Sequence, residues 1–294
     1  MRRIPYLLLD VFTDRPFAGN QLCVILDGTP LSGQEMQSIA QETNLPETTF
    51  VLPPTNPGAT YRNRIFTPGG ELPFAGHPTL GTAAALTIAG RISGTEAVQE
   101  SKSGLTPLTL TYGPTGEIQR VDMVVPQPRI RTRPDPVAVA AVLGLRLEQV
   151  TPSGLAPAAV EAGVSHLVVP VESPEVLASI QPDTAALKAL SRELGVVGAY
   201  PFALLPDGGD SLARARLFAP LFGIPEDPAT GSAAPLLGHF LDLHGLLAGR
   251  ESGFWYEQGV EMGRPSRLWV KVDGVRVEVG GQVRLVGEGQ FLLE

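Results

Sequence analysis

The pattern of apolar and polar positions predicts short strands that alternate with helices. Residues 48–52 and 60–66 alternate in the way that is typical of strands. Residues 78–89 are apolar on nearly all sides, which predicts a helix buried within the protein rather than laid on its surface. An amphipathic helix is predicted at 32–43, with Ser32 as its N-cap.

The segment 50–84 recurs in the second half of the chain. Its residues match at a spacing of 152 positions, which becomes 150 after a gap of two. Common Gly, Pro and Ala residues explain single matches but not an ordered set. The recurrence predicts strands at 199–205 and 212–218, a buried helix at 228–244, and an amphipathic helix at 183–194 capped by Asp183. The matched pairs are Phe50/Phe202, Leu52/Leu204, Pro54/Pro206, Arg62/Arg214, Arg64/Arg216, Phe66/Phe218, Pro68/Pro220 and Pro73/Pro225, then His77/Asp227, Pro78/Pro228, Gly81/Gly231, Thr82/Ser232, Ala83/Ala233 and Ala84/Ala234.

The repeat predicts an α+β protein with two similar domains. We expect each domain to be a curved, barrel-like mixed β-sheet around its buried helix. A pseudo-twofold axis would relate the domains and place the site in the cleft between them. The halves are expected to join in the Pro-rich segment 126–136 or near 112–117. From Phe254 onward, alternation predicts several strands, broken at Asp273-Gly274 and Gly280-Gly281.

Composition narrows the class of protein. The 294 residues include 22 Lys and Arg against 30 Asp and Glu, a net charge of −8, which argues against nucleic-acid binding. The apolar share of 43% supplies material for buried cores, and no apolar stretch reaches the roughly 20 residues of a membrane span. The N-terminal apolar run is short and carries Asp10, which favours a strand over a signal peptide. A single cysteine, Cys23, allows no intramolecular disulfide and fits a reducing cytoplasm.

The starts of the two buried helices are candidates for an anion site. Residues 76–79 and 227–232 would face each other under the pseudo-twofold, and helix N-termini offer unpaired N–H groups and a favourable dipole. A substrate carboxylate is the anion we expect there. The alternative is that Gly76 and Gly231 serve only tight helix packing.

Glu47 is the candidate acid/base. It lies between the first predicted helix and the following strand, and its repeat partner is Ala199, so the carboxylate breaks the symmetry of the two copies. An unduplicated acid in a cleft loop suits general acid/base chemistry, whereas an exposed Glu is more often a solvated surface charge.

Other polar residues near the helix starts leave several roles open. His77 is a proton carrier, a hydrogen-bond donor to substrate, or a helix-capping residue. Asp227 orients a substrate amine or hydroxyl, or only caps its helix. The other histidines, His166, His239 and His244, lack metal-ligand spacing, so we expect no metal site. No Gly-Lys-Ser phosphate loop, dinucleotide fingerprint or Gly-x-Ser-x-Gly elbow is present.

Several blocks together resemble the phenazine-biosynthesis isomerase (PhzF-like) family, within the diaminopimelate-epimerase fold superfamily. They extend in order over nearly the whole chain. The blocks are Asp10-Val11-Phe12-Thr13 with Phe17-Ala18-Gly19-Asn20, Asn44-Leu45-Pro46-Glu47-Thr48-Thr49-Phe50, Arg64 to Gly81 with Ala75-Gly76-His77-Pro78, Glu226-Asp227-Pro228-Ala229-Thr230-Gly231-Ser232-Ala233-Ala234, and Glu257-Gln258-Gly259 with Gly263-Arg264-Pro265-Ser266.

The resemblance implies a catalytic role for Glu47 as acid/base, with His77 and Asp227 also catalytic. It implies substrate binding by the Gly and Ser residues of the two helix starts, Gly76, Gly231 and Ser232. Members of the family isomerise a dihydro-hydroxyanthranilate by moving a proton between ring carbons, without cofactor or metal, and form homodimers. The resemblance further implies that the final strands, from about Gln282, return to the first sheet. Domain one is then 1–117 plus 282–294, and domain two is 118–281.

Two features set this chain apart from its relatives. Racemases of the superfamily use two thiols at the helix heads, where this chain has His77 and Asp227, so two-thiol racemisation is excluded. Gln21-Leu22-Cys23 departs from the commoner family pattern, which leaves the substrate's shape open. The expected function is a cytoplasmic isomerase acting on a small anionic substrate. The alternative is a metabolite-binding or regulatory protein that keeps the cleft without turnover.

Overall fold

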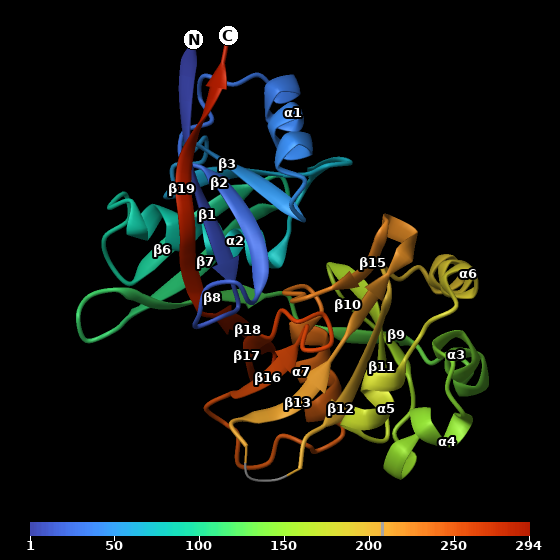
Figure 1. Cartoon of the computed structure of the whole chain (residues 1–294). Coiled ribbons are helices and arrows are strands. Elements are labelled where there is room, and N and C mark those ends of the chain that lie inside the picture. Colours follow the sequence, from blue (N-terminus) through green and yellow to red (C-terminus); the bar gives the residue numbers. More distant parts are fainter. Residues whose placement is uncertain (207–208) are drawn as a thin grey trace. The chain divides into compact units, whose positions relative to one another are not determined.

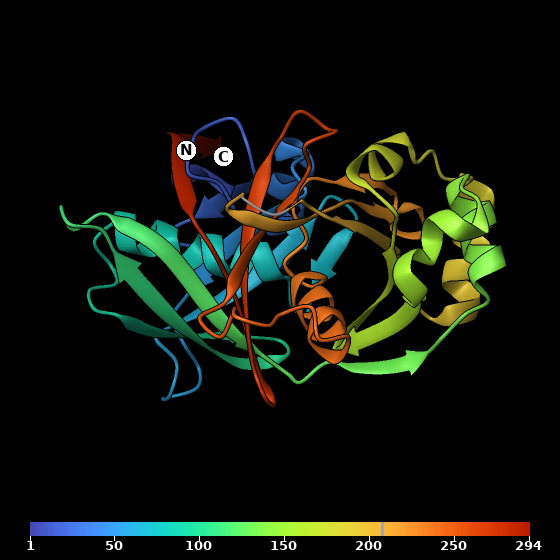
Figure 2. The ribbon, with the colours of Figure 1, turned by 90° about the horizontal axis from the view of Figure 1, so that it is seen from below.

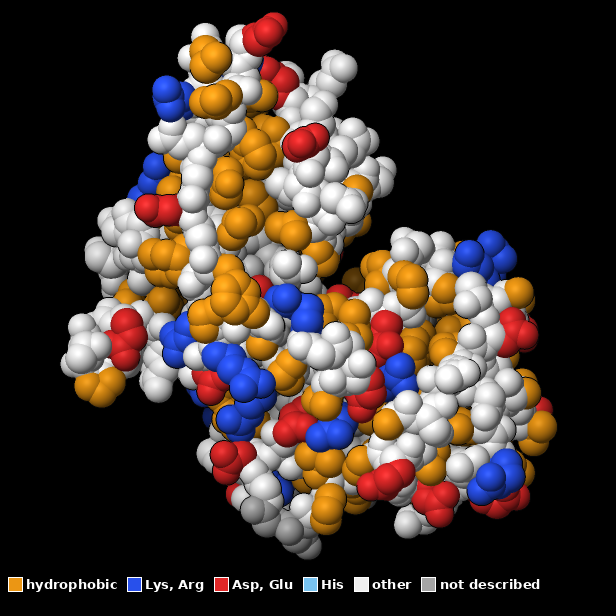
Figure 3. Space-filling model, viewed as in Figure 1, with side chains coloured by type: hydrophobic (Ala, Val, Ile, Leu, Met, Phe, Trp, Pro, Cys, Tyr) orange, Lys and Arg blue, Asp and Glu red, His pale blue; other side chains and the backbone are white. Residues whose placement is uncertain are grey.

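The computed structural model describes residues 1–206 and 209–294. The chain forms two compact units, the first made of residues 1–124 and 280–294 and the second of 125–279 (Figures 1 and 2). Among the described residues, no helix combines the length and apolar character that a membrane crossing requires. Figure 3 shows acidic and basic side chains interspersed on the face that it draws.

The first unit is built from two separate segments of the chain, one on each side of the second unit in sequence. In chain order its elements are β1 (Arg2–Val11), β2 (Asn20–Ile25), α1 (Gly33–Thr43), β3 (Glu47–Leu52), β4 (Tyr61–Thr67), β5 (Gly70–Leu72), α2 (Gly76–Ile88), β6 (Glu96–Ser101), β7 (Gly104–Tyr112), β8 (Ile118–Val125) and β19 (Val283–Leu293). Strand β19 lies antiparallel to β1, with Arg2 opposite Leu293 and Val11 opposite Val283. The prediction that the last strand returns to the first sheet is therefore confirmed.

The second unit is continuous in sequence. Its elements are β9 (Arg129–Thr132), α3 (Pro136–Leu143), α4 (Leu147–Val150), β10 (Ala158–Ala162), β11 (Val164–Pro170), α5 (Pro174–Ser179), α6 (Thr184–Leu194), β12 (Ala199–Leu204), β13 (Ser211–Ala215), β14 (Leu217–Ala219), β15 (Ile224–Asp227), α7 (Ala234–Leu243), β16 (Phe254–Gln258), β17 (Ser266–Asp273) and β18 (Arg276–Gly281). The strand predicted at 212–218 is two strands, β13 and β14, which are separated at Arg216 and both lie antiparallel to β12.

The two units repeat one pattern of strand pairing. In the first, β1–β2 is antiparallel, β2–β3 parallel, β3–β4 antiparallel, β4–β6 parallel and β6–β7 antiparallel. In the second, β10–β11, β11–β12, β12–β13, β13–β16 and β16–β17 follow the same alternation. Each parallel pair needs a crossover, and helices fill these connections: α1 and α2 in one unit, α5 with α6, and α7, in the other. The predicted α+β fold is confirmed.

The repeat extends to side chains. The guanidinium of Arg64 lies 5.0 Å from the Phe66 ring and pairs with Glu71 through two 2.8 Å hydrogen bonds. Arg216 lies 4.6 Å from the Phe218 ring and pairs with Glu226 in the same two-pronged way. Such bidentate pairs fix geometry more firmly than single ion pairs.

Helix α2 forms the centre of the first unit, and helix α7 forms the centre of the second. Every residue of α2 from Gly76 to Leu86 is buried, and the helix contacts β1, β2, β3, β4, β6 and β19. A side chain at Gly81 would collide with Leu22 and Val11, so glycine lets these strands approach. Helix α7 contacts β10, β11 and β17. The prediction of two buried helices is confirmed.

Candidate active site

The structure places Glu47 and His77 side by side in the first unit. Glu47 is the first residue of β3, and His77 is the second residue of α2. The Nε2 atom of His77 lies 3.2 Å from Oε2 of Glu47 and 3.3 Å from the carbonyl oxygen of Gln21. Parallel pairing of β2 with β3, which sets Leu22 opposite Glu47, brings the Gln21 carbonyl to this place.

His77 is a neutral hydrogen-bond donor in this arrangement. Burial lowers the pKa of its imidazole to about 3, so the ring is uncharged at neutral pH. The hydrogen-bond partner of Nε2 is the Gln21 carbonyl oxygen, which can only accept, so the single ring proton belongs on Nε2. Which of the three roles that the sequence left open belongs to His77 stays a prediction.

The first turn of α2 is held by buried polar contacts rather than by an N-cap side chain. Ala75 occupies the N-cap position in an extended conformation and makes no side-chain cap. The Thr79 hydroxyl donates to the Ala75 carbonyl at 2.8 Å, and the Gln99 amide donates to Thr79 at 2.8 Å. Because the N-cap residue supplies no side-chain hydrogen bond, the first N–H groups of the helix, at Gly76 and His77, are suited to an anion.

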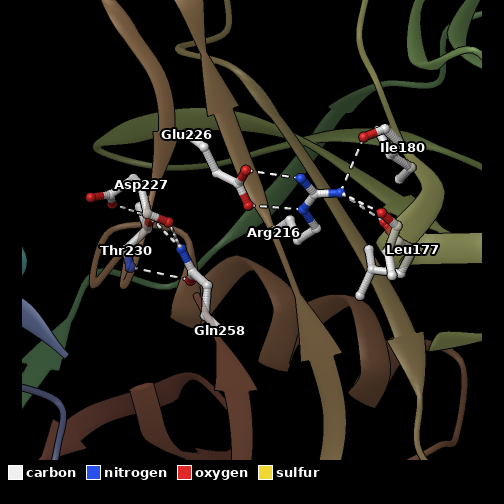
Figure 4. A network of polar contacts seen from close by, with 8 residues as sticks. Leu177, Ile180, Arg216, Glu226, Asp227, Thr230 and Gln258 are labelled. Carbon is white, nitrogen blue, oxygen red and sulfur yellow. Dashed lines mark hydrogen bonds and ion pairs between the residues drawn. The ribbon is translucent and has the colours of Figure 1, made fainter. Parts of the chain in front are cut away.

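Asp227 and Ser232 lie in the second unit, in contact with residues to which the sequence assigned no role in the site. Asp227 ends β15, and its Oδ2 accepts a hydrogen bond from the Thr230 hydroxyl. The amide of Gln258 donates to the Asp227 carbonyl at 2.8 Å (Figure 4). The side chain of Asp227 is thus fixed by Thr230 of its own turn, and its backbone carbonyl is fixed by Gln258 of β16.

Helix α7 starts later than predicted. The expected helix at 228–244 begins at Ala234, so Gly231 and Ser232 lie in the turn before it. A helix starting at 228 would pair the Asp227 carbonyl with the N–H four residues on, but Gln258 occupies this carbonyl and also accepts from the Thr230 N–H. The prediction that these residues form a helix start is therefore wrong.

Ser232 has a buried histidine as its partner. Nε2 of His166, on β11, lies 3.1 Å from the Ser232 hydroxyl. His166 is 1% exposed, and burial lowers its pKa to about 4, so it too is neutral at neutral pH. Its spacing from the other histidines gave no indication of this contact. The signal that could have found His166 is a lone polar ring within the apolar strand Val164–Pro170.

The site residues therefore form two groups. Glu47, Gly76 and His77 lie together in the first unit, and Asp227, Gly231 and Ser232 lie within one short stretch of the second. That the two groups build one site stays a prediction. Across the part of the chain that the structure describes, no three His, Cys, Asp or Glu residues are grouped so that they could hold a metal ion.

A cavity in the second unit is separate from these residues. Its volume is about 480 Å³, and Arg216, Glu226 and Lys188 are among the residues that line it. None of the predicted site residues lines this cavity.

Comparison with known proteins shows the family. The family model described as phenazine biosynthesis-like protein (PhzC-PhzF) matches residues 9–293. An uncharacterized isomerase of Mesorhizobium japonicum is 36% identical, and the alignment covers 98% of each chain. The trans-2,3-dihydro-3-hydroxyanthranilate isomerase of Pseudomonas aeruginosa is also 36% identical, over 98% of this chain and 99% of that protein.

A solved structure supports the same assignment. The PhzF-family phenazine biosynthesis protein of Bacillus anthracis has a TM-score of 0.86 and 26% identity over the full length of both chains. Family model, named relatives and fold agree over essentially the whole chain. The chain therefore belongs to the phenazine biosynthesis-like (PhzC-PhzF) family of isomerases.

Proposed function

We propose that this isomerase works without a cofactor and that Glu47 moves a proton between two positions of a small, carboxylate-bearing substrate. The observation that carries the proposal is the placement of the Glu47 carboxylate 3.2 Å from a neutral histidine at the uncapped head of α2. A carboxylate beside an anion-attracting helix start is suited to substrates that present both a carboxylate and an acidic C–H bond.

The reaction needs two proton transfers. Glu47 takes a proton from a carbon next to an activating group, and the electron pair of that C–H bond moves into the conjugated system of the substrate. The resulting carboxylic acid then gives its proton to another carbon, where a new C–H bond forms. The substrate gains and loses no atoms, and Glu47 ends as the carboxylate with which it began.

His77 positions the base in this scheme. Its Nε2–H group is hydrogen-bonded to the Gln21 carbonyl and lies beside the Glu47 carboxylate, so it positions the carboxylate without carrying a charge. A cationic partner would stabilise the ionised base much more strongly and make it a weaker proton acceptor. We assign Asp227 and Ser232 to the polar groups of the substrate, and the first turn of α2, with Gly76, to its carboxylate.

The substrate class follows from the relatives. Those named trans-2,3-dihydro-3-hydroxyanthranilate isomerase supply the first compound to test, and cyclic amino-acid-like compounds are the second group. We further propose that the protein acts in the cytoplasm as a homodimer.

The test is proton exchange in heavy water with the wild type and Glu47→Gln. The amide keeps the size of the side chain but cannot take up a proton, so we expect near-normal binding and a turnover lower by roughly 10² to 10⁴. Glu42→Gln, on the exposed side of α1, is the matched control and should exchange as the wild type does.

Two outcomes would contradict the proposal. Near wild-type exchange by Glu47→Gln on a confirmed substrate would remove the carboxylate from the chemistry. Binding of these compounds without exchange by the wild-type protein would instead favour a metabolite-binding or regulatory protein.

A further inference from the structure

Five side chains of the second unit form a continuous run of hydrogen bonds that ends on Asp227. The hydroxyls of Tyr256 and Tyr200 lie 2.9 Å apart, and the Tyr200 hydroxyl lies 2.8 Å from Oε1 of Gln258. Nε2 of Gln258 lies 2.9 Å from the Thr230 hydroxyl, which donates to Oδ2 of Asp227. Figure 4 shows the last three members. Tyr200, Tyr256 and Gln258 are completely buried, and Thr230 is 7% exposed.

The orientation of the Gln258 amide is fixed by its partners. The Thr230 N–H, which can only donate, lies 3.2 Å from one amide atom, so that atom is the oxygen. The NH₂ group therefore faces the Asp227 carbonyl and the Thr230 hydroxyl. All four hydrogen-bonding positions of the amide are occupied.

The direction of every bond in the run then follows. The Gln258 oxygen can only accept, so the Tyr200 hydroxyl donates to it and Tyr256 donates to Tyr200. Because Thr230 accepts from the Gln258 amide, its own proton goes to Asp227. Burial raises the pKa of both tyrosines, and the charge of Asp227 raises that of Tyr200 further, so both hydroxyls keep their protons at neutral pH. A run of donors that all point one way strengthens each bond in it.

We propose that Gln258 is a positioning residue of this isomerase. It accepts a hydrogen bond from Tyr200 and donates one to Thr230, whose own hydrogen bond keeps Asp227 a carboxylate. Only the catalytic use of Asp227 rests on the proposed function. Held in this way, Asp227 accepts hydrogen bonds and donates none. Its partner on the substrate is therefore an N–H or O–H donor, the amine or hydroxyl of an amino-acid-like compound.

The first unit contains a similar run of a tyrosine, a glutamine and a threonine, but its last hydrogen bond goes to a different kind of acceptor. Tyr61 donates to Oε1 of Gln99 at 3.2 Å, and Gln99 donates to Thr79 at 2.8 Å. Thr79 then donates to the backbone carbonyl of Ala75 rather than to a carboxylate. Tyr61→Phe therefore removes an equivalent hydroxyl without touching the run that leads to Asp227, which makes it a matched control.

The experiment follows the carboxyl carbon of Asp227 by NMR as pH is lowered, with Asp227→Asn identifying the signal. Thr230 from the turn donates to this carboxylate, Gln258 from β16 donates to the Asp227 backbone carbonyl, and the charge of Asp227 acts on Tyr200 from β12. The neighbouring Glu226 is paired with Arg216. Thr230→Val keeps the shape and removes the last donor, so the pKa of Asp227 should rise by roughly one pH unit.

Three further variants complete the test. Thr230→Ser keeps the hydroxyl and should titrate as the wild type does. Gln258→Met should raise the pKa of Asp227 as Thr230→Val does, and it should lower kcat/KM roughly tenfold. Tyr61→Phe should leave the Asp227 titration unchanged. Wild-type titration of both Thr230→Val and Gln258→Met, or an equal shift in Tyr61→Phe, would overturn the proposal. The titration needs no substrate, so its outcome is independent of the Glu47 experiment.

Discussion

At the scale of single residues, two histidines are kept neutral by burial. His77 lies beside Glu47, and His166 lies beside Ser232, each with Nε2 toward its partner. Burial brings their pKa values to about 3 and about 4. A buried neutral imidazole orients its partner without adding charge, which suits a site that binds an anion and keeps a carboxylate basic.

These histidines predict a stability that falls in acid. Each has a lower pKa in the folded chain than the 6.5 of a free histidine, so unfolding takes up a proton below that pH. Their contribution to the free energy of unfolding is complete above pH 6.5 and decreases as the pH falls toward the folded pKa. At pH 4.5 the loss is about 2 to 3 kcal/mol per histidine. Urea unfolding at pH 7 and pH 4.5 measures it. His166→Gln should lose less stability between these pH values than the wild type, and an equal loss would contradict the assignment.

The sequence predicted the residues that belong to motifs and missed those that depend on strand pairing. Glu47 stood out because its repeat partner is Ala199, and His77 because it opens the first repeated helix. His166 has no local signal of function, since its partner lies 66 positions away along the chain. Gln258 belongs to a family block, but its role was not predicted because its partner Thr230 lies 28 positions away. Periodicity identifies strands but does not say which side chains meet across them.

At the scale of elements, α2 differs from α1 and α6 at its first turn. Ser32 caps α1 in a capping box with Glu35, and Asp183 caps α6 by accepting from two backbone N–H groups, so both N-cap predictions are confirmed. Helix α2 has Ala75 at this position. The uncapped start sits where the proposed substrate carboxylate would bind, which predicts a conflict between stability and function.

Ala75→Asp tests this conflict. The new carboxylate would accept from the first-turn N–H groups and stabilise the helix by about 1 kcal/mol, while it competes with the substrate carboxylate. We expect a higher melting temperature together with a KM raised roughly tenfold or more. Ser32→Ala is the control, with a loss of about 1 kcal/mol and an unchanged KM. Tighter substrate binding by Ala75→Asp would argue against an anion at this helix start.

The late start of α7 shows where element prediction failed. The apolar pattern of residues 228–244 is helical in type, but it carries no information about a side chain from another strand. Gln258 takes up the Asp227 carbonyl and the Thr230 N–H, and the chain forms a turn before the helix begins at Ala234. The element type was predictable from the sequence, whereas its first residue depends on a contact with β16.

At the scale of the whole molecule, the first unit depends on its last strand. β19 pairs with β1 along its length, and both tryptophans, Trp255 and Trp269, lie in the second unit. A chain that ends at Gln282 should lose protection of the β1 amides, with hydrogen exchange faster by roughly 100-fold or more. Its tryptophan fluorescence should still report a cooperative unfolding transition of the second unit. Protection of β1 equal to that of the full chain would contradict this dependence.

The pairing of β1 with β19 also orders events during protein synthesis. Residues 125–279 leave the ribosome as one uninterrupted stretch, and the second unit therefore has all its strands before translation ends. The first unit, although it emerges earlier, holds β1 with one edge open until residues 283–293 appear. An open edge is a template for pairing with other chains, so β1 is prone to misassembly until β19 has been made.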